Sequence, residues 1–99
     1  MRLVIIGVDN TVGVDGNFRN GLDLVGCGLP ENFWALQWNE HGDEKGHIEY
    51  NSPMIQNQEI TEVPNWANAC VAVWQAKLDQ EAVEAVEAEA ARLAAQQGS

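Results

Sequence analysis

The chain has 99 residues, 15 of them acidic and 5 basic, which gives a formal net charge of −10 at pH 7. This length predicts one domain with a single modest core, for which four tryptophans, two phenylalanines and one tyrosine supply large apolar side chains. The charge argues against nucleic acid and anionic membranes as direct partners, because both are bound through Lys and Arg side chains that replace counterions.

The N-terminal segment predicts a β-strand. Residues 3–8 form a nearly continuous apolar, β-branched run interrupted by Gly7, which is typical of a strand buried on both faces. The run ends at Val8 without a small-residue cleavage site, so it does not fit a secretory signal peptide. No segment has the roughly 18 to 20 apolar residues that cross a bilayer. We therefore expect a soluble, cytoplasmic protein in which Cys27 and Cys70 remain free thiols rather than forming the one disulfide that two cysteines allow.

Short elements and turns are predicted next. A strand over residues 11–14 is followed by Asp15-Gly16, a pair that favours a tight hairpin turn because such turns need positive φ. The Asn- and Gly-rich residues 17–21 predict irregular structure, and residues 22–25 predict a short extended piece. Residues 26–32 predict a loop.

An antiparallel hairpin is predicted after this loop. Trp34, Leu36 and Trp38 alternate along one strand and should share its core-facing side. A polar turn over residues 39–45 leads to a second strand over residues 46–50. If one tryptophan is exposed, Trp38 beside the turn is the candidate for a protein contact.

A long helix is predicted at the C-terminal end. Residues 51–63 predict an ordered connection, and Pro53 argues against a central strand there. Pro64-Asn65 marks the helix start, because Pro is tolerated in a first turn and Asn is a good N-cap. The helix should run to about Gln96, with Gly98 as its end signal.

Two apolar stripes divide this helix. The first has the spacing of a helix face that packs on a sheet, and it consists of Trp66, Cys70, Val73, Trp74 and Leu78. The second has the alternating spacings of a coiled coil, and it consists of Val83, Val86, Ala90 and Leu93. We therefore predict a compact α+β domain over residues 1–78, in which a small antiparallel β-meander packs on the first half of the helix, and an acidic helical extension over residues 79–99.

The helical extension is the predicted contact surface. Its acidic residues face few basic ones, and like charges on neighbouring turns weaken an isolated helix. An ordered extension would therefore need its second stripe to be covered by another copy of the chain or by a partner protein. Less than two heptads of apolar residues also fit a solvated, partly frayed helix, and that interpretation stays open.

No catalytic, cofactor-binding or metal-binding residues are predicted. His41 and His47 lie in one polar turn with two glycines, which favours an exposed hairpin tip over convergent metal ligands. Residues 9–17 lack the closing Glu of a calcium loop and contain no phosphate-binding motif. Serine occurs only at Ser52 and Ser99, so no nucleophile and base are paired by the sequence. We expect no cofactor and no enzymatic activity.

Five segments of the chain carry a resemblance to a known family. They are residues 8–16 (VDNTVGVDG), 34–39 (WALQWN), 46–50 (GHIEY), 57–61 (NQEIT) and 66–74 (WANACVAVW). With these segments the chain resembles small tailed-bacteriophage proteins encoded near tail-fibre genes, and the resemblance extends over residues 1–76. It implies a tail-associated role, either as a small structural subunit or as a chaperone that assists fibre folding and attachment.

The expected function is therefore a non-enzymatic, phage tail-associated structural or assembly protein that binds a tail-fibre or baseplate protein. It would act in the host cytoplasm during assembly or in the virion tail. We expect a homo-oligomer, with a trimer favoured over a dimer because fibres are commonly three-fold. The predicted contact residues are Val83, Val86, Ala90, Leu93 and Trp38. The alternative is an acidic counter-defence inhibitor that mimics nucleic acid and blocks a basic site on a host protein.

Overall fold

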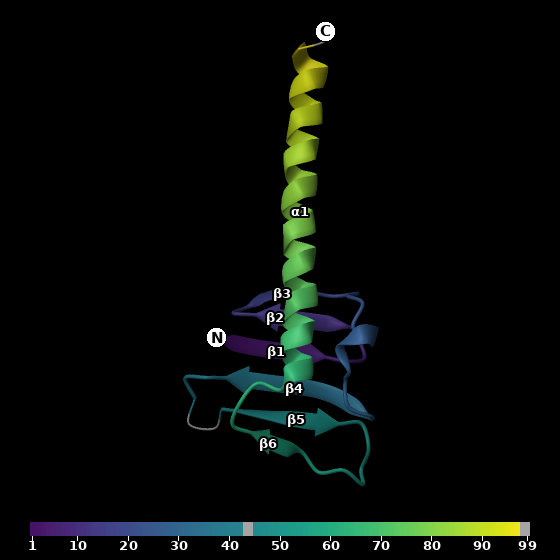
Figure 1. Ribbon diagram of the computed structural model, residues 1–99, viewed down its shortest axis with the longest axis vertical. Helices are drawn as coiled ribbons and strands as arrows, with labels where there is room; N and C mark the ends of the chain where they lie inside the picture. Colours follow the sequence, from purple (N-terminus) through teal and green to yellow (C-terminus); the bar gives the residue numbers. More distant parts are fainter. Residues whose placement is uncertain (43–44, 98–99) are drawn as a thin grey trace.

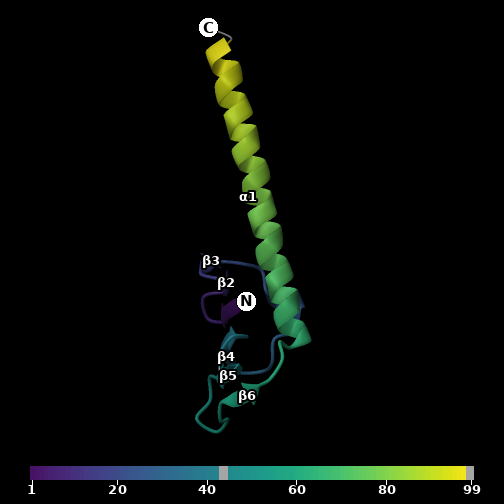
Figure 2. The same ribbon diagram turned by 90° about the vertical axis from the view of Figure 1, so that its left-hand side faces the viewer.

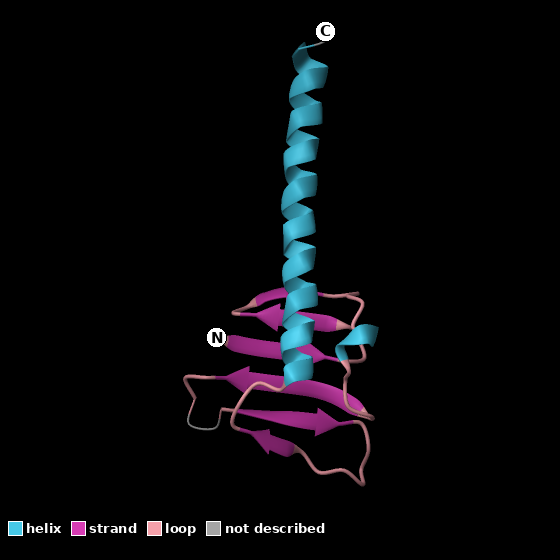
Figure 3. Ribbon diagram, viewed as in Figure 1, coloured by secondary structure: helices cyan, strands magenta, loops and turns pink. Residues whose placement is uncertain are grey.

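The structure, a computed structural model, describes residues 1–42 and 45–97. It consists of a six-stranded antiparallel sheet and one long helix, which confirms the predicted α+β class (Figures 1 and 3). Gly98, the predicted end signal of the helix, lies outside the described residues. The elements in chain order are β1 (Arg2–Ile6), β2 (Thr11–Val14), β3 (Asn17–Arg19), the 3-10 helix η1 (Val25–Cys27), β4 (Phe33–Asn39), β5 (Gly46–Tyr50), β6 (Gln58–Ile60) and α1 (Asn65–Gln97).

The sheet joins two three-stranded meanders. Its strand order is β3-β2-β1-β4-β5-β6, and every neighbouring pair is antiparallel. The first strands of the two meanders, β1 and β4, lie side by side in the centre, where Leu3 pairs with Trp38 and Ile5 with Leu36. Because paired residues point to the same face of a sheet, this register gathers the large apolar side chains on one face.

The helix covers that apolar face. Figure 2 shows α1 on one side of the sheet and no helix on the other. Leu3, Ile5 and Leu36 are completely buried, as are Ala67 and Cys70 of α1, and all five belong to one core cluster. Burying one such Leu or Ile side chain stabilises the fold by roughly 1.5 to 3 kcal/mol. The protein is therefore a two-layer structure whose core lies between the sheet and the first half of α1.

The first stripe of the helix packs on the sheet as predicted. The helix begins at Asn65, the residue predicted to start it. The predicted core residues of the stripe are all buried or partly buried against the core cluster, and they are Trp66, Cys70, Val73, Trp74 and Leu78.

The predicted hairpin turn is confirmed between β2 and β3. Asp15 and Gly16 both have positive φ, 51° and 85°. Two successive residues with positive φ match the right-handed twist of the flanking strands, so the strands continue as a hairpin without splaying. The Asp15 carboxylate also accepts a hydrogen bond of 2.8 Å from the backbone N–H of Arg2, which ties the turn to β1.

The prediction that three large side chains of β4 share the core face is wrong for Trp34. The pairing of β4 with β5 shifts register between Phe33 and Ala35, which inserts an extra residue into β4. A β-bulge of this kind redirects the side chains on one side of it. Phe33 consequently packs against the core, whereas Trp34 is 41% exposed.

Two edge strands occur where none was predicted. Residues 17–19 form β3 and residues 58–60 form β6, in segments expected to be irregular or connecting. Each is created by backbone hydrogen bonding to its one neighbour, β2 or β5. Pairing of this kind requires no apolar alternation in the sequence, because edge strands are largely exposed.

The first strand and the segment before η1 also differ from expectation. Strand β1 ends at Ile6, and Val8 lies in the turn that follows, where it is 66% exposed. The strand is buried on one face only, at Leu3 and Ile5, because the helix covers one face of the sheet. Residues 22–25 do not form an extended strand. Instead, Leu22 and Leu24 are buried in the core and η1 follows them.

Candidate protein-interaction surface

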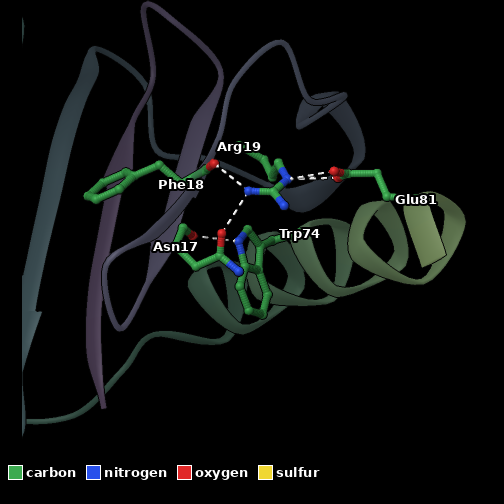
Figure 4. Close-up of polar contacts among 5 residues, drawn as sticks. All are labelled: Asn17, Phe18, Arg19, Trp74 and Glu81. Carbon is green, nitrogen blue, oxygen red and sulfur yellow. Dashed lines mark hydrogen bonds and ion pairs between the residues drawn. The ribbon is translucent and has the colours of Figure 1, made fainter. Parts of the chain in front are cut away.

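Two aromatic contacts hold the first half of α1 on the sheet. The Trp66 ring packs edge-on against Phe33, with ring centroids 5.1 Å apart. One turn of helix past Cys70, the Trp74 indole Nε1 donates a hydrogen bond of 2.9 Å to the carbonyl oxygen of Asn17 (Figure 4). The second contact satisfies both the buried indole N–H and an edge-strand carbonyl, so the orientation of the helix across the sheet is fixed by β4 at one end and by β3 at the other.

An ion pair marks the point where the helix leaves the sheet. Arg19 Nε donates to the two carboxylate oxygens of Glu81 over 3.1 and 2.7 Å (Figure 4). Arg19 Nη1 also donates to the Asn17 side chain and to the Phe18 carbonyl oxygen, which restricts the guanidinium. Hydrogen bonding by Arg19 lowers the pKa of Glu81. The stabilisation from this pair is therefore present above the unfolded pKa of a Glu and is lost as pH falls through the lowered folded value.

Beyond Glu81 the helix projects away from the rest of the molecule (Figure 1). Residues 82–96 are all exposed, and the molecule extends over 65 × 27 × 18 Å. Residues 66–97 contain neither Gly nor Pro and are rich in Ala, the residue with the highest helix propensity. The docked first half also supplies a preformed helical nucleus, which removes the unfavourable step of helix initiation for the projecting part.

An apolar seam runs along this projecting part. We call it the outer seam, and it consists of Val83, Val86, Ala90 and Leu93, the residues of the second predicted stripe. Its three larger members are 56%, 69% and 44% exposed in chain order. Large apolar side chains exposed in a row along one element are typical of an interaction surface.

The outer seam faces away from the sheet. An α-helix turns by about 100° per residue, so Val83, nine positions after Trp74, lies roughly half a turn around the axis from it, and the other members of the seam lie roughly 100° to 160° from it. Since Trp74 points into the core, the seam points outward. A partner can therefore contact the seam without meeting the sheet of the same chain, and the sheet cannot fold back to cover it.

Acidic side chains flank the outer seam on both sides. Glu89 and Glu87 occupy the positions directly before and after seam residues, which are the flanking positions of a heptad. Asp79 lies on the same line as the seam, four residues before Val83, at a core position of the preceding heptad. Glu89 accepts a hydrogen bond from Arg92, the one basic residue between positions 79 and 97. The seam is therefore apolar along its centre and negatively charged at its borders.

Trp38 does not provide the predicted contact. Its side chain is 7% exposed and belongs to the core cluster, where it packs beside Gly46. The exposed tryptophan is Trp34, which the β4 bulge places at the surface near Tyr50. Sequence alternation correctly placed Trp38 on the core face but did not indicate the exposure of Trp34, because a bulge leaves no marker in the residue pattern of β4.

The uncovered face of the sheet carries a second surface feature. A hollow of about 820 Å³ lies over the uncovered sheet face, where Val4, Gln37, His47 and Glu59 form one row across four strands. The described lining residues of this hollow include neither Ser nor Cys that could pair with His47. Among residues 1–42 and 45–97, no three His, Cys, Asp or Glu side chains are grouped to hold a metal ion. None of the helices in the described part of the chain has the length and apolar composition that spanning a membrane requires.

The two cysteines are free thiols, and both are buried, although burial was predicted for Cys70 alone. Burial, reinforced by the neighbouring Cys27 thiol, raises the pKa of Cys70 from 9.0 to about 12. At pH 8 we expect iodoacetamide to alkylate Cys70 roughly a thousandfold more slowly in the folded protein than in urea, because the thiolate is the reactive form. Mass spectrometry of digested samples over time measures this ratio. Equal rates in the two conditions would contradict the assignment.

The same pKa difference gives a pH dependence of stability. The unfolded Cys70 thiol releases its proton near 9.0, whereas the folded thiol keeps it to about 12. The unfolded state therefore binds fewer protons between these values, and the free energy of unfolding should decrease as pH rises through that range. Urea unfolding at pH 8 and pH 10.5 measures this decrease for the unmodified chain and for Cys70→Ala. We expect the free energy of unfolding to decrease less for the variant, which lacks the thiol.

Comparisons with known proteins identify no relative. No family model matches the chain, and the comparisons with curated proteins and with solved structures find no match. The resemblance to tail-associated phage proteins therefore stays a sequence-based expectation.

Proposed function

We propose that this chain is a non-enzymatic structural or assembly protein of a phage tail, which binds a tail-fibre or baseplate protein through the outer seam. The single observation that carries the proposal is a helix whose first half packs on the sheet and whose last part projects past it with an exposed apolar seam. A folded domain that holds such a helix away from its own surface presents it to another protein. The tail context comes from the resemblance in residues 1–76.

A coexpression experiment tests this proposal. The chain is produced together with the fibre and baseplate proteins of the same phage genome, and complexes are measured by size-exclusion chromatography with light scattering. We expect a complex that Val86→Asp weakens roughly tenfold or more, because an unpaired carboxylate would be buried in the contact. Ala88→Asp is the matched control, since it adds the same charge to the opposite side of the projecting helix. Equal effects of the two variants, or no complex with any of these proteins, would refute the proposal.

Self-association remains a prediction of the heptad spacing. The measurement is light scattering of the free chain and of a chain that ends at Leu78, over a tenfold range of concentration. A trimer or dimer that disappears on truncation would confirm a homo-oligomer formed by the projecting helix. If both chains were monomers, the seam would not bind a second copy, and its partner would be a different protein.

The acidic borders of the seam favour a second candidate function, an inhibitor that occupies a basic nucleic-acid site. Between Asp79 and Gln97 the chain carries five acidic residues and one basic residue. Such binding would weaken steeply as salt concentration rises, because exposed charges are screened. Binding through the apolar residues of the seam would change little with salt, and it would depend on Val86 and Leu93 rather than on the acidic side chains.

A further inference from the structure

We propose that the outer seam binds an amphipathic helix of a different protein, one that carries Lys or Arg beside its own apolar residues. This inference rests on the proposed function and names the chemistry of the partner. It follows from three features of the projecting helix, namely the direction of the seam, the charges at its borders and the lack of cations to neutralise them.

The shape of the seam fits one helix. Val83 and Leu93 are ten residues apart, which corresponds to about 15 Å along the axis. A partner segment of two to three heptads spans that length, and its apolar side chains can insert between Val83, Val86, Ala90 and Leu93. Figure 2 shows the last part of α1 clear of the sheet, so the approach of such a helix is unobstructed by the same chain.

A second copy of this chain is a poor occupant in either orientation. In a parallel pair, Asp79 would face Asp79 of the second copy at a central position of the contact. In an antiparallel pair that matches Val83 with Leu93, the flanking residues Glu87 and Glu89 would each face their own counterpart. Like charges held opposite one another are destabilising, and each copy already carries a net charge of −10.

A basic partner removes these conflicts. Lys or Arg at the flanking positions of the partner helix would pair with Glu87 and Glu89, and a further cation would meet Asp79. The chain cannot supply these charges itself, since Arg92 is the one basic residue in this stretch and already donates to Glu89. The apolar centre supplies attraction, and the acidic borders select the sign of the partner's charge.

Two synthetic helical peptides test the inference on the full chain. Both have 21 residues with Leu at the two core positions of each heptad. One has Lys and the other has Glu at the flanking positions, so like charges oppose self-pairing of either peptide. Binding is measured by fluorescence anisotropy at low salt. We expect the Lys peptide to bind at least about tenfold more tightly than the Glu peptide, and Val86→Asp to abolish the binding.

Charge reversal is the decisive control. The double variant Glu87→Lys with Glu89→Lys should reverse the preference, so that the Glu peptide binds more tightly. Glu84→Lys with Ala88→Lys adds comparable positive charge away from the seam and should keep the original preference. If both double variants shifted the preference toward the Glu peptide to the same extent, net charge alone would explain the binding. That result would overturn the inference. So would equal binding of the two peptides to the unmodified chain.

The remaining outcomes separate this inference from the proposed function. Suppose that neither peptide binds but the complex with a fibre or baseplate protein still depends on Val86. Then the basic-helix inference is wrong and the proposed function stands. A Val86-dependent oligomer of the free chain would assign the seam to a second copy and also overturn the inference. If Val86→Asp changes neither peptide binding nor complex formation, both proposals fail.

Discussion

Replacing Trp74 with alanine should lower the free energy of unfolding by about 3 to 5 kcal/mol, the range observed for large aromatic side chains removed from a core. Trp74 is 8% exposed and packs between the sheet and α1, and its Nε1 donates to the Asn17 carbonyl oxygen over 2.9 Å. The change removes a large apolar side chain of α1 from the core cluster. Domains of this size have a free energy of unfolding of roughly 5 to 15 kcal/mol, so the expected loss is a large part of the total stability. Urea unfolding followed by circular dichroism measures the loss.

Two further variants separate the causes of this loss. Trp74→Phe keeps an aromatic ring in the core but removes the N–H donor to Asn17, so a loss of about 1 to 3 kcal/mol is expected from the unsatisfied carbonyl and the smaller ring. Trp34→Ala serves as the matched control, because the Trp34 ring is 41% exposed and buries less area. Similar losses for Trp74→Ala and Trp34→Ala would contradict the assignment of Trp74 to the core and Trp34 to the surface.

Replacing Gly46 with alanine should destabilise the protein by about 1 to 3 kcal/mol, the usual cost of overpacking. A Cβ atom at this position would lie 2.6 Å from the carbonyl oxygen of Gln37 and 2.9 Å from the Trp38 ring. The oxygen belongs to the backbone of β4 and cannot rotate away, so the β4–β5 pairing must shift at the centre of the second meander. Thermal and urea unfolding both report this change.

Gly26 provides the matched control for this prediction. A Cβ atom at Gly26 would meet no atom within 4 Å, and the backbone there does not have positive φ. Gly26→Ala should therefore leave stability unchanged, or raise it by up to about 1 kcal/mol by restricting the unfolded chain. If the two substitutions had the same effect on stability, the close approach of β4 and β5 at Gly46 would not be the cause of the destabilisation.

Local features of the chain were predictable because each depends on a few neighbouring residues. Asp15-Gly16 predicted the turn that joins β2 and β3, since its two positive φ values are rare in other residues. Asn65 predicted the start of α1, and the lack of Gly and Pro predicted its length. Helical spacing also placed Cys70 and Trp74 on the sheet-facing side.

Features that depend on distant parts of the chain were not predictable. The register shift between Phe33 and Ala35 arises from pairing with β5, and it places Trp34 at the surface instead of on the core face. The edge strands β3 and β6 exist through backbone hydrogen bonds to their neighbours. The ion pair between Arg19 and Glu81 joins residues 62 positions apart and has no local sequence signal.

The candidate surface combines both kinds of information. The residue pattern was enough to predict a helix of this extent, the acidic residues along it and its apolar residues, because helix periodicity depends only on position along the chain. These apolar residues are Val83, Val86, Ala90 and Leu93. The pattern did not predict that this seam faces away from the sheet and is left exposed, which the folded arrangement shows. That direction depends on which side of α1 docks on the sheet and on where contact ends at Glu81, and long-range packing with β3 and β4 sets both.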